Sequence, residues 1–428
     1  MGRGVTAYVR YRTDNDARRV YETYGRLLLQ ALPRKQGGVS DVIKGTIFGH
    51  CFVGLLALGG ATTADAEDAF QPEQVSVGKL PVANAYRVYA SDFAISHVID
   101  GKLRVIDGES PRILGTVSAG GFGVTTLSPD RKELYIATTY YPRLNRGERI
   151  DQVDVYDAMT LELKGEIAIP PKHAQMLGYR GGIRTSSDGR FLYVQNATPA
   201  TSVSVVDISA RKFVAEISTP GCWIILPSQS FANRFSALCG DGTVLTVTLD
   251  GEGKLQSQKR SKRFFDPDKD PIFVHAENIG DRYFFVSFYG TIHVANLGGE
   301  EAAIEEPWSL ISTADQKTGW RPGGYQPFGL HEQSGRLFVG VHPDGKEGSH
   351  KDPAKEIWVF DLAGKKRLAR LPGNSAIALT VSRGAAPKLF AINGKNMSLA
   401  VYDNADGKPV FRRRLTAIGE SATQLETQ

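Results

Sequence analysis

Cysteine is almost absent from this sequence, which has only three in 428 residues. Cys51 lies in an apolar segment near the N-terminus, whereas Cys222 and Cys239 lie close together in the middle of the chain. No CxxC motif and no zinc-ligand spacing is present, which argues against a structural zinc site. In so cysteine-poor a chain, the close pair requires an explanation.

The sequence also lacks an excess of charge of one sign. It has 51 Lys and Arg against 46 Asp and Glu, a formal net charge of +5. A chain so balanced has no global basic field to attract nucleic acid. We therefore expect no nucleic-acid partner.

Recognisable catalytic motifs are missing as well. There is no HExxH, GxSxG or P-loop, and the glycines of "GGFG" and "RPGGYQ" precede no helix that could bind a phosphate. The segment "HPDGKEGSH" could bind a metal through His342, Asp344, Glu347 and His350, but it lacks tight ligand spacing and is better explained as an ordinary polar loop. The sequence therefore predicts no catalytic residues and no metal in this chain, and it favours a scaffold or binding subunit.

The N-terminal region has the features of an export signal. The apolar run "GTIFGHCFVGLLALGG" is too short and too rich in glycine to span a bilayer. It is followed by "ATTADA", a small-x-small pattern that predicts cleavage after Ala66. The alternative is a buried apolar segment of a cytosolic domain. Residues 1–40 are longer than the usual charged region of a signal peptide. This part is therefore either a long leader or the result of a translation start placed too far upstream.

These features divide the chain into a leader at 1–66, an N-terminal arm at 67–83 and a folded domain at 84–428, with no membrane span after cleavage. In an exported chain the two remaining cysteines are in an oxidising compartment. The segment between them, "WIILPSQSFANRFSAL", predicts a strand, a turn and a strand, and a hairpin of that length can bring its ends together. We therefore predict a Cys222–Cys239 disulfide; the alternative is two unpaired buried thiols.

A repeating unit dominates the rest of the sequence. An apolar strand is followed by a second strand that ends in Asp or Asn, then by a turn and a strand of alternating charge, as in "VDVYDAMTLELKGEI" and "IWVFDLAGKKRLARL". The turn residues of the seven copies lie 42 to 65 residues apart and are Asp107, Asp157, Asp207, Asp250, Asn296, Asp361 and Asp403. Each copy has the length of a four-stranded antiparallel blade.

One such sheet cannot bury both of its faces, so the copies must stack. The prediction is an all-β fold, a seven-bladed β-propeller. A pair of β-sandwiches is the alternative, but it would not require a repeat of this period. Long insertions at 138–152, 312–329 and 341–356 carry Tyr, Arg, Trp and His, a composition that favours a protein partner over plain solvated loops.

Particular segments resemble the heavy chain of the quinoprotein amine dehydrogenases, the family of methylamine and aromatic (aralkyl) amine dehydrogenases. The resemblance covers roughly residues 84–425. It rests on "GWRPGGYQ" (319–326), "RGERIDQVDVYD" (146–157), "HPDGKEGSHK" (342–351) and the cysteine hairpin. The third of these, followed by "EIWVFD", leans toward the aromatic-amine branch. The first 40 residues fit no such exported chain.

The resemblance implies a periplasmic seven-bladed propeller. Two heavy chains assemble with two light chains that carry tryptophan tryptophylquinone and the catalytic aspartate. The assembly deaminates a primary amine to an aldehyde and ammonia, and passes electrons to a blue copper protein of the azurin or amicyanin type. The heavy chain itself carries no cofactor. Its four tryptophans lie in different segments, with no arrangement that indicates a crosslinked pair, and are interpreted as core or interface residues: Trp223, Trp308, Trp320 and Trp358.

The family also places a heavy-chain aromatic near the substrate channel, for which Phe93 and Phe122 are the candidates, although either could be a core residue. The light-chain contacts that we predict are Tyr140, Tyr141, Trp320 and Tyr325. Two other functions stay open. A self-contained, lactonase-like propeller hydrolase would bring several of its histidines together at the central channel, from among His97, His275, His293 and His331. A cell-surface binding propeller would need no light chain.

Overall fold

The computed structural model describes residues 76–175 and 179–428. Residues 77–428 form one compact unit, whose regular secondary structure is almost entirely β-strand. The predicted leader, with Ala66 and Cys51, and most of the predicted arm lie outside the described residues. Within the described residues, no helix is long and apolar enough to cross a membrane.

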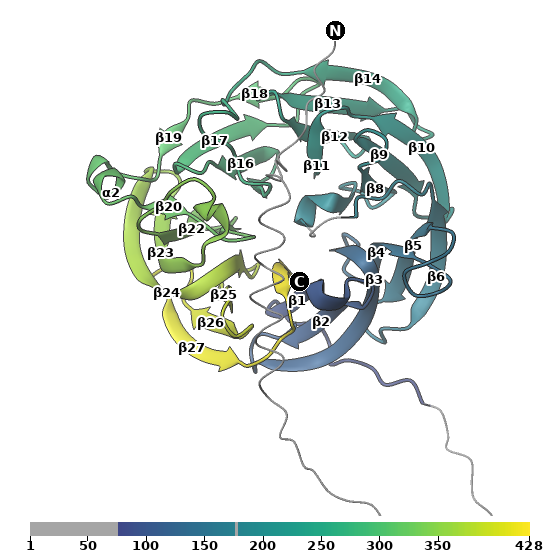
Figure 1. Cartoon of the computed structure of the whole chain (residues 1–428), viewed down its shortest axis with the longest axis horizontal. Coiled ribbons are helices and arrows are strands. Elements are labelled where there is room, and N and C mark those ends of the chain that lie inside the picture. Colours follow the sequence, from purple (N-terminus) through teal and green to yellow (C-terminus); the bar gives the residue numbers. More distant parts are fainter. Residues whose placement is uncertain (1–75, 176–178) are drawn as a thin grey trace, which may run out of the picture. The chain divides into compact units, whose positions relative to one another are not determined.

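Antiparallel strands follow one another around a common centre (Figure 1). The first strands are β1 (Arg87–Asp92), β2 (Gly101–Asp107), β3 (Arg112–Leu127), β4 (Glu133–Tyr140), β5 (Ile150–Asp157) and β6 (Leu163–Ile169). Two four-stranded sheets follow, formed by β7 (Ile183–Thr185), β8 (Phe191–Asn196), β9 (Ser202–Asp207) and β10 (Lys212–Ser218), and by β11 (Cys222–Pro227), β12 (Arg234–Cys239), β13 (Val244–Leu249) and β14 (Leu255–Arg260).

The second half continues the pattern. Its strands are β15 (Glu277–Ile279), β16 (Arg282–Val286), β17 (Thr291–Asn296), β18 (Ala303–Ile304), β19 (Trp308–Ser309), β20 (Arg321–Pro322), β21 (Phe328–His331), β22 (Arg336–His342), β23 (Ala354–Asp361), β24 (Lys366–Val381), β25 (Leu389–Asn393), β26 (Leu399–Asp403), β27 (Val410–Leu415) and β28 (Ala422–Thr427). The short helical turns are η1 (Ile95–His97), η2 (Arg180–Gly182), α2 (Thr313–Lys317) and η3 (Ser349–Lys351).

Two long strands each serve two groups of strands. The first part of β3 pairs with β2, and its second part, from Gly121 onward, pairs with β4. In the same way β24 pairs first with β23 and then with β25. Left-handed backbone angles mark both changes of partner, at Gly120 (φ 54°) and Phe122 (φ 57°), and at Asn374 (φ 48°) and Ser375 (φ 57°). These residues turn the chain from one group of strands into the next.

The two ends of the described chain meet in one sheet. The C-terminal strand β28 pairs with β1, with Ala90 opposite Leu425. A hydrophobic cluster then joins this sheet to the preceding one, because Phe390 and Ile392 of β25 pack with Val88 of β1. Similar clusters lie between the other consecutive groups of strands. Burial between neighbouring sheets therefore stabilises this fold.

The predicted turn residues lie at the ends of the third strands. Asp107 Oδ1 accepts hydrogen bonds from the backbone N–H groups of Glu109 and Ser110, at 3.0 and 3.3 Å. Equivalent turn bonds form at Asp157, Asp207, Asp250, Asn296 and Asp361. At Asp403 the carboxylate instead pairs with Lys388. The prediction that these residues form turns is confirmed in six of the seven copies.

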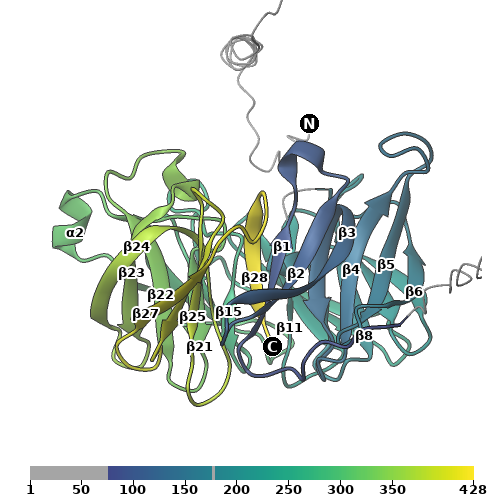
Figure 2. The ribbon, with the colours of Figure 1, turned by 90° about the horizontal axis from the view of Figure 1, so that it is seen from below.

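The long loops gather at one end of the sheets. Loops 93–100, 141–149 and 343–353 each follow the second strand of a group, and loop 310–327 precedes the first strand β21. In an antiparallel sheet, the end of the second strand lies beside the beginning of the first. Figure 2 shows α2 and the loop above β5 on the same side of the sheets. We call these four loops the long-loop face.

Candidate functional site

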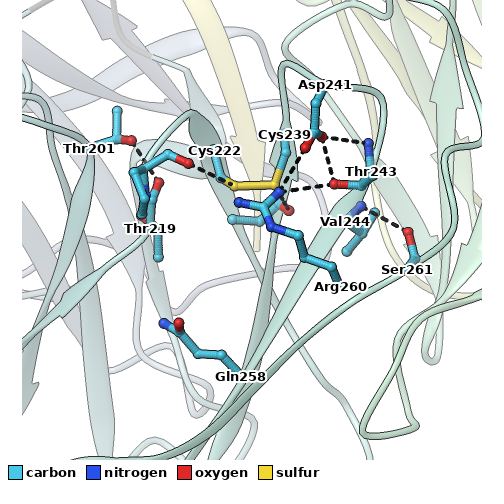
Figure 3. The surroundings of a disulfide bond; sticks show 12 residues. Thr201, Thr219, Cys222, Cys239, Asp241, Thr243, Val244, Gln258, Arg260 and Ser261 are labelled. Atoms are coloured by element: carbon cyan, nitrogen blue, oxygen red, sulfur yellow. Dashed lines mark hydrogen bonds and ion pairs between the residues drawn. A yellow bond between two sulfur atoms is a disulfide. The ribbon is translucent and has the colours of Figure 1, made fainter. Parts of the chain in front are cut away.

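The predicted disulfide is present. Cys222 and Cys239 are opposite each other in the β11–β12 register, and their sulfur atoms are 2.08 Å apart. Figure 3 shows the adjoining turn, in which Asp241 accepts hydrogen bonds from Thr243 and from Arg260 Nη1 at 3.1 Å. Both cysteines are buried in a cluster with residues of β8 to β13. The disulfide therefore ties β11, the strand of this sheet that lies nearest the centre of the molecule, to its neighbour β12.

Charged side chains converge on the centre of the molecule. We call them the axial cluster, which consists of Arg131, Arg180, Arg184, Glu277, Arg383 and Glu426. Arg180 lies on η2, and its Nη1 is 2.5 Å from Glu277 Oε1 on β15. Arg131 Nη1, in the turn after β3, is 3.5 Å from Glu426 Oε1 on β28. The cluster therefore joins strands that are far apart in the sequence.

Electrostatics at the axial cluster favours the ionised forms of Glu277 and Arg180. Burial opposes ionisation of Glu277, but Arg180 and His275 lower the pKa of this carboxyl to about 2. His275 Nε2 lies 3.3 Å from Glu277 Oε1 and 3.0 Å from the carbonyl oxygen of Phe328. Burial nevertheless lowers the pKa of His275, so this ring is neutral at neutral pH.

Two arginines of the cluster behave differently. Arg184 and Arg383 form no ion pair or side-chain hydrogen bond among the described residues. Burial, together with the nearby Arg180, lowers the pKa of Arg184 to about 10. Desolvation and Arg131 likewise lower the pKa of Arg383. Arg184 is half-buried, whereas Arg383 is exposed at the surface, where solvent screens its charge.

A small hollow adjoins the cluster. The space between its lining residues is about 260 Å³ when the adjoining open solvent is included, so the hollow itself is much smaller. Its lining residues come from β1, β3, β28 and the segment before β7: Ser91, Phe93, Val124, Thr125, Tyr179, Arg180, Gln424, Leu425 and Glu426. Phe93, predicted at the substrate channel, is buried and lines this hollow. Phe122 is half-buried at the bend of β3 and does not line it.

The predicted partner contacts all belong to the long-loop face or its border. Tyr140 is half-buried and donates a hydrogen bond of 2.6 Å to Asp154 Oδ2, and Tyr141 accepts one of 3.2 Å from Gln175 Nε2. Tyr325 packs against a core cluster, and Lys351 lies 5.4 Å above its ring. The Tyr hydroxyls and rings at this face are therefore partly accessible.

Trp320 is more deeply placed, with 9% of its surface exposed. Its ring lies 5.2 Å from that of Trp358, so the fold brings together two of the four tryptophans that the sequence places in different segments. Trp358 is fully buried, and Arg367 and Arg370 lie over its ring. The other two tryptophans pack against core clusters. The Trp320–Trp358 pair is therefore a packing contact.

The histidines are dispersed. His97 is exposed and lies 3.1 Å from Glu420, whereas His331 is buried and contacts Ser334 and the carbonyl of Gly384. His293 packs against Phe264 and Phe265. Among residues 76–175 and 179–428, no three His, Cys, Asp or Glu side chains are placed to hold a metal ion, and this includes the loop with His342 and His350.

Sequence reasoning did not find the axial cluster. Its members are spread from Arg131 to Glu426 and share no motif. Only the ring-like arrangement of the sheets brings them together. The one available signal is position, since Arg184 and Glu277 lie on first strands and Arg131 and Arg383 follow first strands directly.

Comparison with known proteins separates the fold from the family. The periplasmic gluconolactonase of Pseudomonas aeruginosa has a similar fold, with a TM-score of 0.53 at 14% identity over 80% of this chain and 98% of that chain. The profile of the methylamine dehydrogenase heavy chain family (MADH) matches residues 84–427. The chain therefore belongs to the methylamine dehydrogenase heavy chain family.

Named relatives agree with this assignment. The methylamine dehydrogenase heavy chain of Methylophilus methylotrophus is 27% identical over 82% of this chain and 85% of its own length. The corresponding protein of Methylobacillus flagellatus is 28% identical over 83% of this chain and 91% of its own length. These relatives support an amine dehydrogenase heavy subunit, a component of an oxidoreductase.

Proposed function

We propose that this chain is the non-catalytic heavy subunit of a periplasmic amine dehydrogenase, which oxidises a primary amine to an aldehyde and ammonia. Family membership is the observation that carries the proposal. The partner is a light chain bearing tryptophan tryptophylquinone, which accepts electrons from the amine when the assembly is complete. This chain supplies a rigid surface that binds the light chain and shapes the approach of the amine.

The rigid surface is a closed seven-bladed propeller. Counting β3 and β24 twice, the antiparallel strands fall into seven groups, and the chain ends share one of them through the β1–β28 pair. Seven hydrophobic clusters lie between successive groups, including the cluster that joins the last group to the first. A closed ring leaves few free sheet edges, which favours a surface that changes little on binding.

The light chain binds at the long-loop face in this proposal. Tyr140, Tyr141 and Tyr325 provide aromatic rings with polar groups at their edges, a composition that is enriched in protein interfaces. Trp320 contributes through its exposed edge. Two heavy and two light chains form the assembly, and a blue copper protein of the azurin or amicyanin type receives the electrons.

Phe93 and Phe122 shape the substrate entrance. Both lie near the end of the sheets that carries the long loops, and Phe122 is held in a left-handed conformation at the bend of β3. Their role is steric: an apolar ring holds the organic part of the amine and excludes water.

The relatives named above are methylamine dehydrogenase heavy chains, whereas the "HPDGKEGSHK" loop favours an aromatic or aralkyl amine. Turnover of tyramine and of methylamine by the assembled enzyme distinguishes the two.

A matched pair of variants tests the binding face. Tyr141→Ala removes an aromatic group from the long-loop face. Phe231→Ala removes an exposed aromatic group from the turn between β11 and β12, at the end of the sheets away from the long-loop face. Light-chain affinity, measured by surface plasmon resonance, should fall by about tenfold or more for an interface aromatic. It should not change for Phe231→Ala. Equal effects of the two variants would contradict docking at this face.

A further inference from the structure

The loop between β4 and β5, residues 141–149, holds a large apolar side chain in solvent. Leu144 has 77% of its surface exposed and belongs to no hydrophobic cluster among the described residues. Its backbone is left-handed, with φ 61°. A side chain with a Cβ atom costs free energy in this conformation, and glycine is the usual residue where a tight turn requires it. Leu144 is therefore unfavourable twice over, through its backbone and through its exposure.

Other large aliphatic residues with left-handed backbone angles are placed differently. Leu161 (φ 59°) and Met397 (φ 50°) pack against core clusters, and Ile224 (φ 55°) is buried in one. Hydrophobic burial within the fold outweighs the backbone cost at these three positions. Leu144 has no such burial among residues 76–175 and 179–428, so a contact with a second molecule is the remaining source of compensation.

Hydrogen bonds hold this loop in one conformation. The backbone N–H of Arg143 donates to the carbonyl oxygen of Arg146 at 3.0 Å, and the N–H of Arg146 donates to the carbonyl oxygen of Arg143 at 3.2 Å, which closes a tight turn at Leu144. At the base of the loop, Arg149 donates two hydrogen bonds, of 2.8 and 2.7 Å, to the buried carboxylate of Asp151. Figure 2 shows the loop extending beyond the ends of β4 and β5. A projection that is already ordered loses little conformational entropy on binding.

The charges of the loop indicate what surrounds the contact. Arg143 and Arg146 flank the turn, both are exposed, and neither forms an ion pair with another residue that the structure describes. Glu148 is the one acidic residue in 141–149, and Arg149 is already paired with Asp151. The exposed side chains therefore have a surplus of positive charge. A complementary surface has an apolar hollow for the leucine and carboxylates at its edge.

We propose that Leu144 inserts into an apolar hollow of the light chain that is bordered by carboxylates. This inference rests on the function proposed above, because it adds a contact within the same binding face. Continuity with that face supports the light chain as the occupant. The loop begins at Tyr141, one of the aromatic residues assigned to the face, and Ile150 directly after it adds an apolar side chain that is 43% exposed.

Light-chain binding, measured by surface plasmon resonance with the full chain, tests the contact. Leu144→Gly removes the side chain and suits the left-handed backbone, so the melting temperature of the chain alone should stay unchanged or rise. Dissociation of the light chain should accelerate by about tenfold or more, as for loss of a buried Leu side chain. Met159→Ala is the matched control, because it removes an exposed apolar side chain beyond the other end of β5, and it should change neither quantity.

The charged rim has its own measurement. The double variant Arg143→Gln with Arg146→Gln should slow association of the light chain and reduce the dependence of the association rate on salt concentration. An unchanged salt dependence would contradict a border of carboxylates.

The outcomes separate this inference from the proposed function. If the unaltered chain binds no light chain, the proposed function fails, and the contact fails with it. If the unaltered chain binds and Leu144→Gly binds equally well, the contact is overturned while the function stands. A clear fall in the melting temperature of Leu144→Gly would show that the side chain packs within this chain, which would also overturn the inference.

A photo-crosslinking amino acid in place of Leu144 identifies the occupant in the assembled enzyme. A crosslinked product with the light chain supports the proposal. A product with a second copy of this chain, or with the copper protein, in place of the light chain would overturn it.

Discussion

Replacing Glu277 by Gln should destabilise the protein strongly, because the substitution removes the counter-charge of a buried arginine. The Glu277 side chain is 13% exposed and the Arg180 side chain 16% exposed, so solvent screens this pair weakly. The amide of Gln can still accept a hydrogen bond, but it carries no charge. Arg180 would then remain near Arg184 with only the more distant Glu426 to balance both.

The magnitude follows from the pKa of Glu277. Although burial alone would raise it, Arg180 and His275 lower the pKa from 4.5 to about 2. Each unit corresponds to about 1.4 kcal/mol, so ionised Glu277 contributes roughly 3 kcal/mol at neutral pH. This agrees with the range of about 3–5 kcal/mol for breaking a buried ion pair from one side. Because the folded pKa is lowered, this stability is complete above pH 4.5 and is lost as the pH falls toward 2.

Urea-induced unfolding followed by tryptophan fluorescence measures the effect. We expect Glu277→Gln to reduce the free energy of unfolding by roughly 3 kcal/mol, and Glu301→Gln, at an exposed position, to change it little. The double variant Arg180→Gln with Glu277→Gln should recover part of the loss, since no unpaired cation remains. The reasoning is refuted if Glu277→Gln is as stable as the unaltered protein. It is also refuted if adding Arg180→Gln to Glu277→Gln lowers the free energy of unfolding by as much as Arg180→Gln would if the two side chains did not interact.

Three further outcomes follow from the structure. Reducing the Cys222–Cys239 disulfide should lower the free energy of unfolding by about 3 kcal/mol, the value for a loop of this length, in urea titrations with and without dithiothreitol. Burial lowers the pKa of His173 from 6.5 to about 4, so the free energy of unfolding should decline by up to roughly 3 kcal/mol as the pH falls from 6.5 to 4. His173→Asn should flatten that pH profile, and an unchanged profile would contradict the assignment of this pH dependence to His173. Tyr140→Phe removes a donor to the buried Asp154 carboxyl and should cost about 1–3 kcal/mol in thermal unfolding, whereas no loss would show that water replaces the hydroxyl.

Features set by neighbouring residues could be predicted from the sequence. The recurring Asp turns depend on hydrogen bonds to residues two to four positions away, and their spacing indicated the repeating sheets. The Cys222–Cys239 disulfide is equally local, because a single hairpin brings its ends together. Asp403 departs from the pattern because Lys388, which directly precedes the adjacent strand β25, pairs with its carboxylate.

Features created by contact between different sheets could not be predicted. Arg180 and Glu277 are separated by 97 positions, and nothing local distinguishes them from surface residues. The contact between Trp320 and Trp358 was missed for the same reason, since their segments meet only when loop 310–327 folds over the following sheet. Whether a half-buried Tyr at the long-loop face binds a partner also depends on a surface that belongs to the other chain.

Amine-dependent reduction of an artificial dye, measured with the purified chain alone and after addition of its light chain, tests the central claim most directly. The account predicts no turnover of tyramine or methylamine by the chain alone, and turnover that appears with a one-to-one ratio of light chain. Amine oxidation by the isolated chain, free of any light chain, would contradict it.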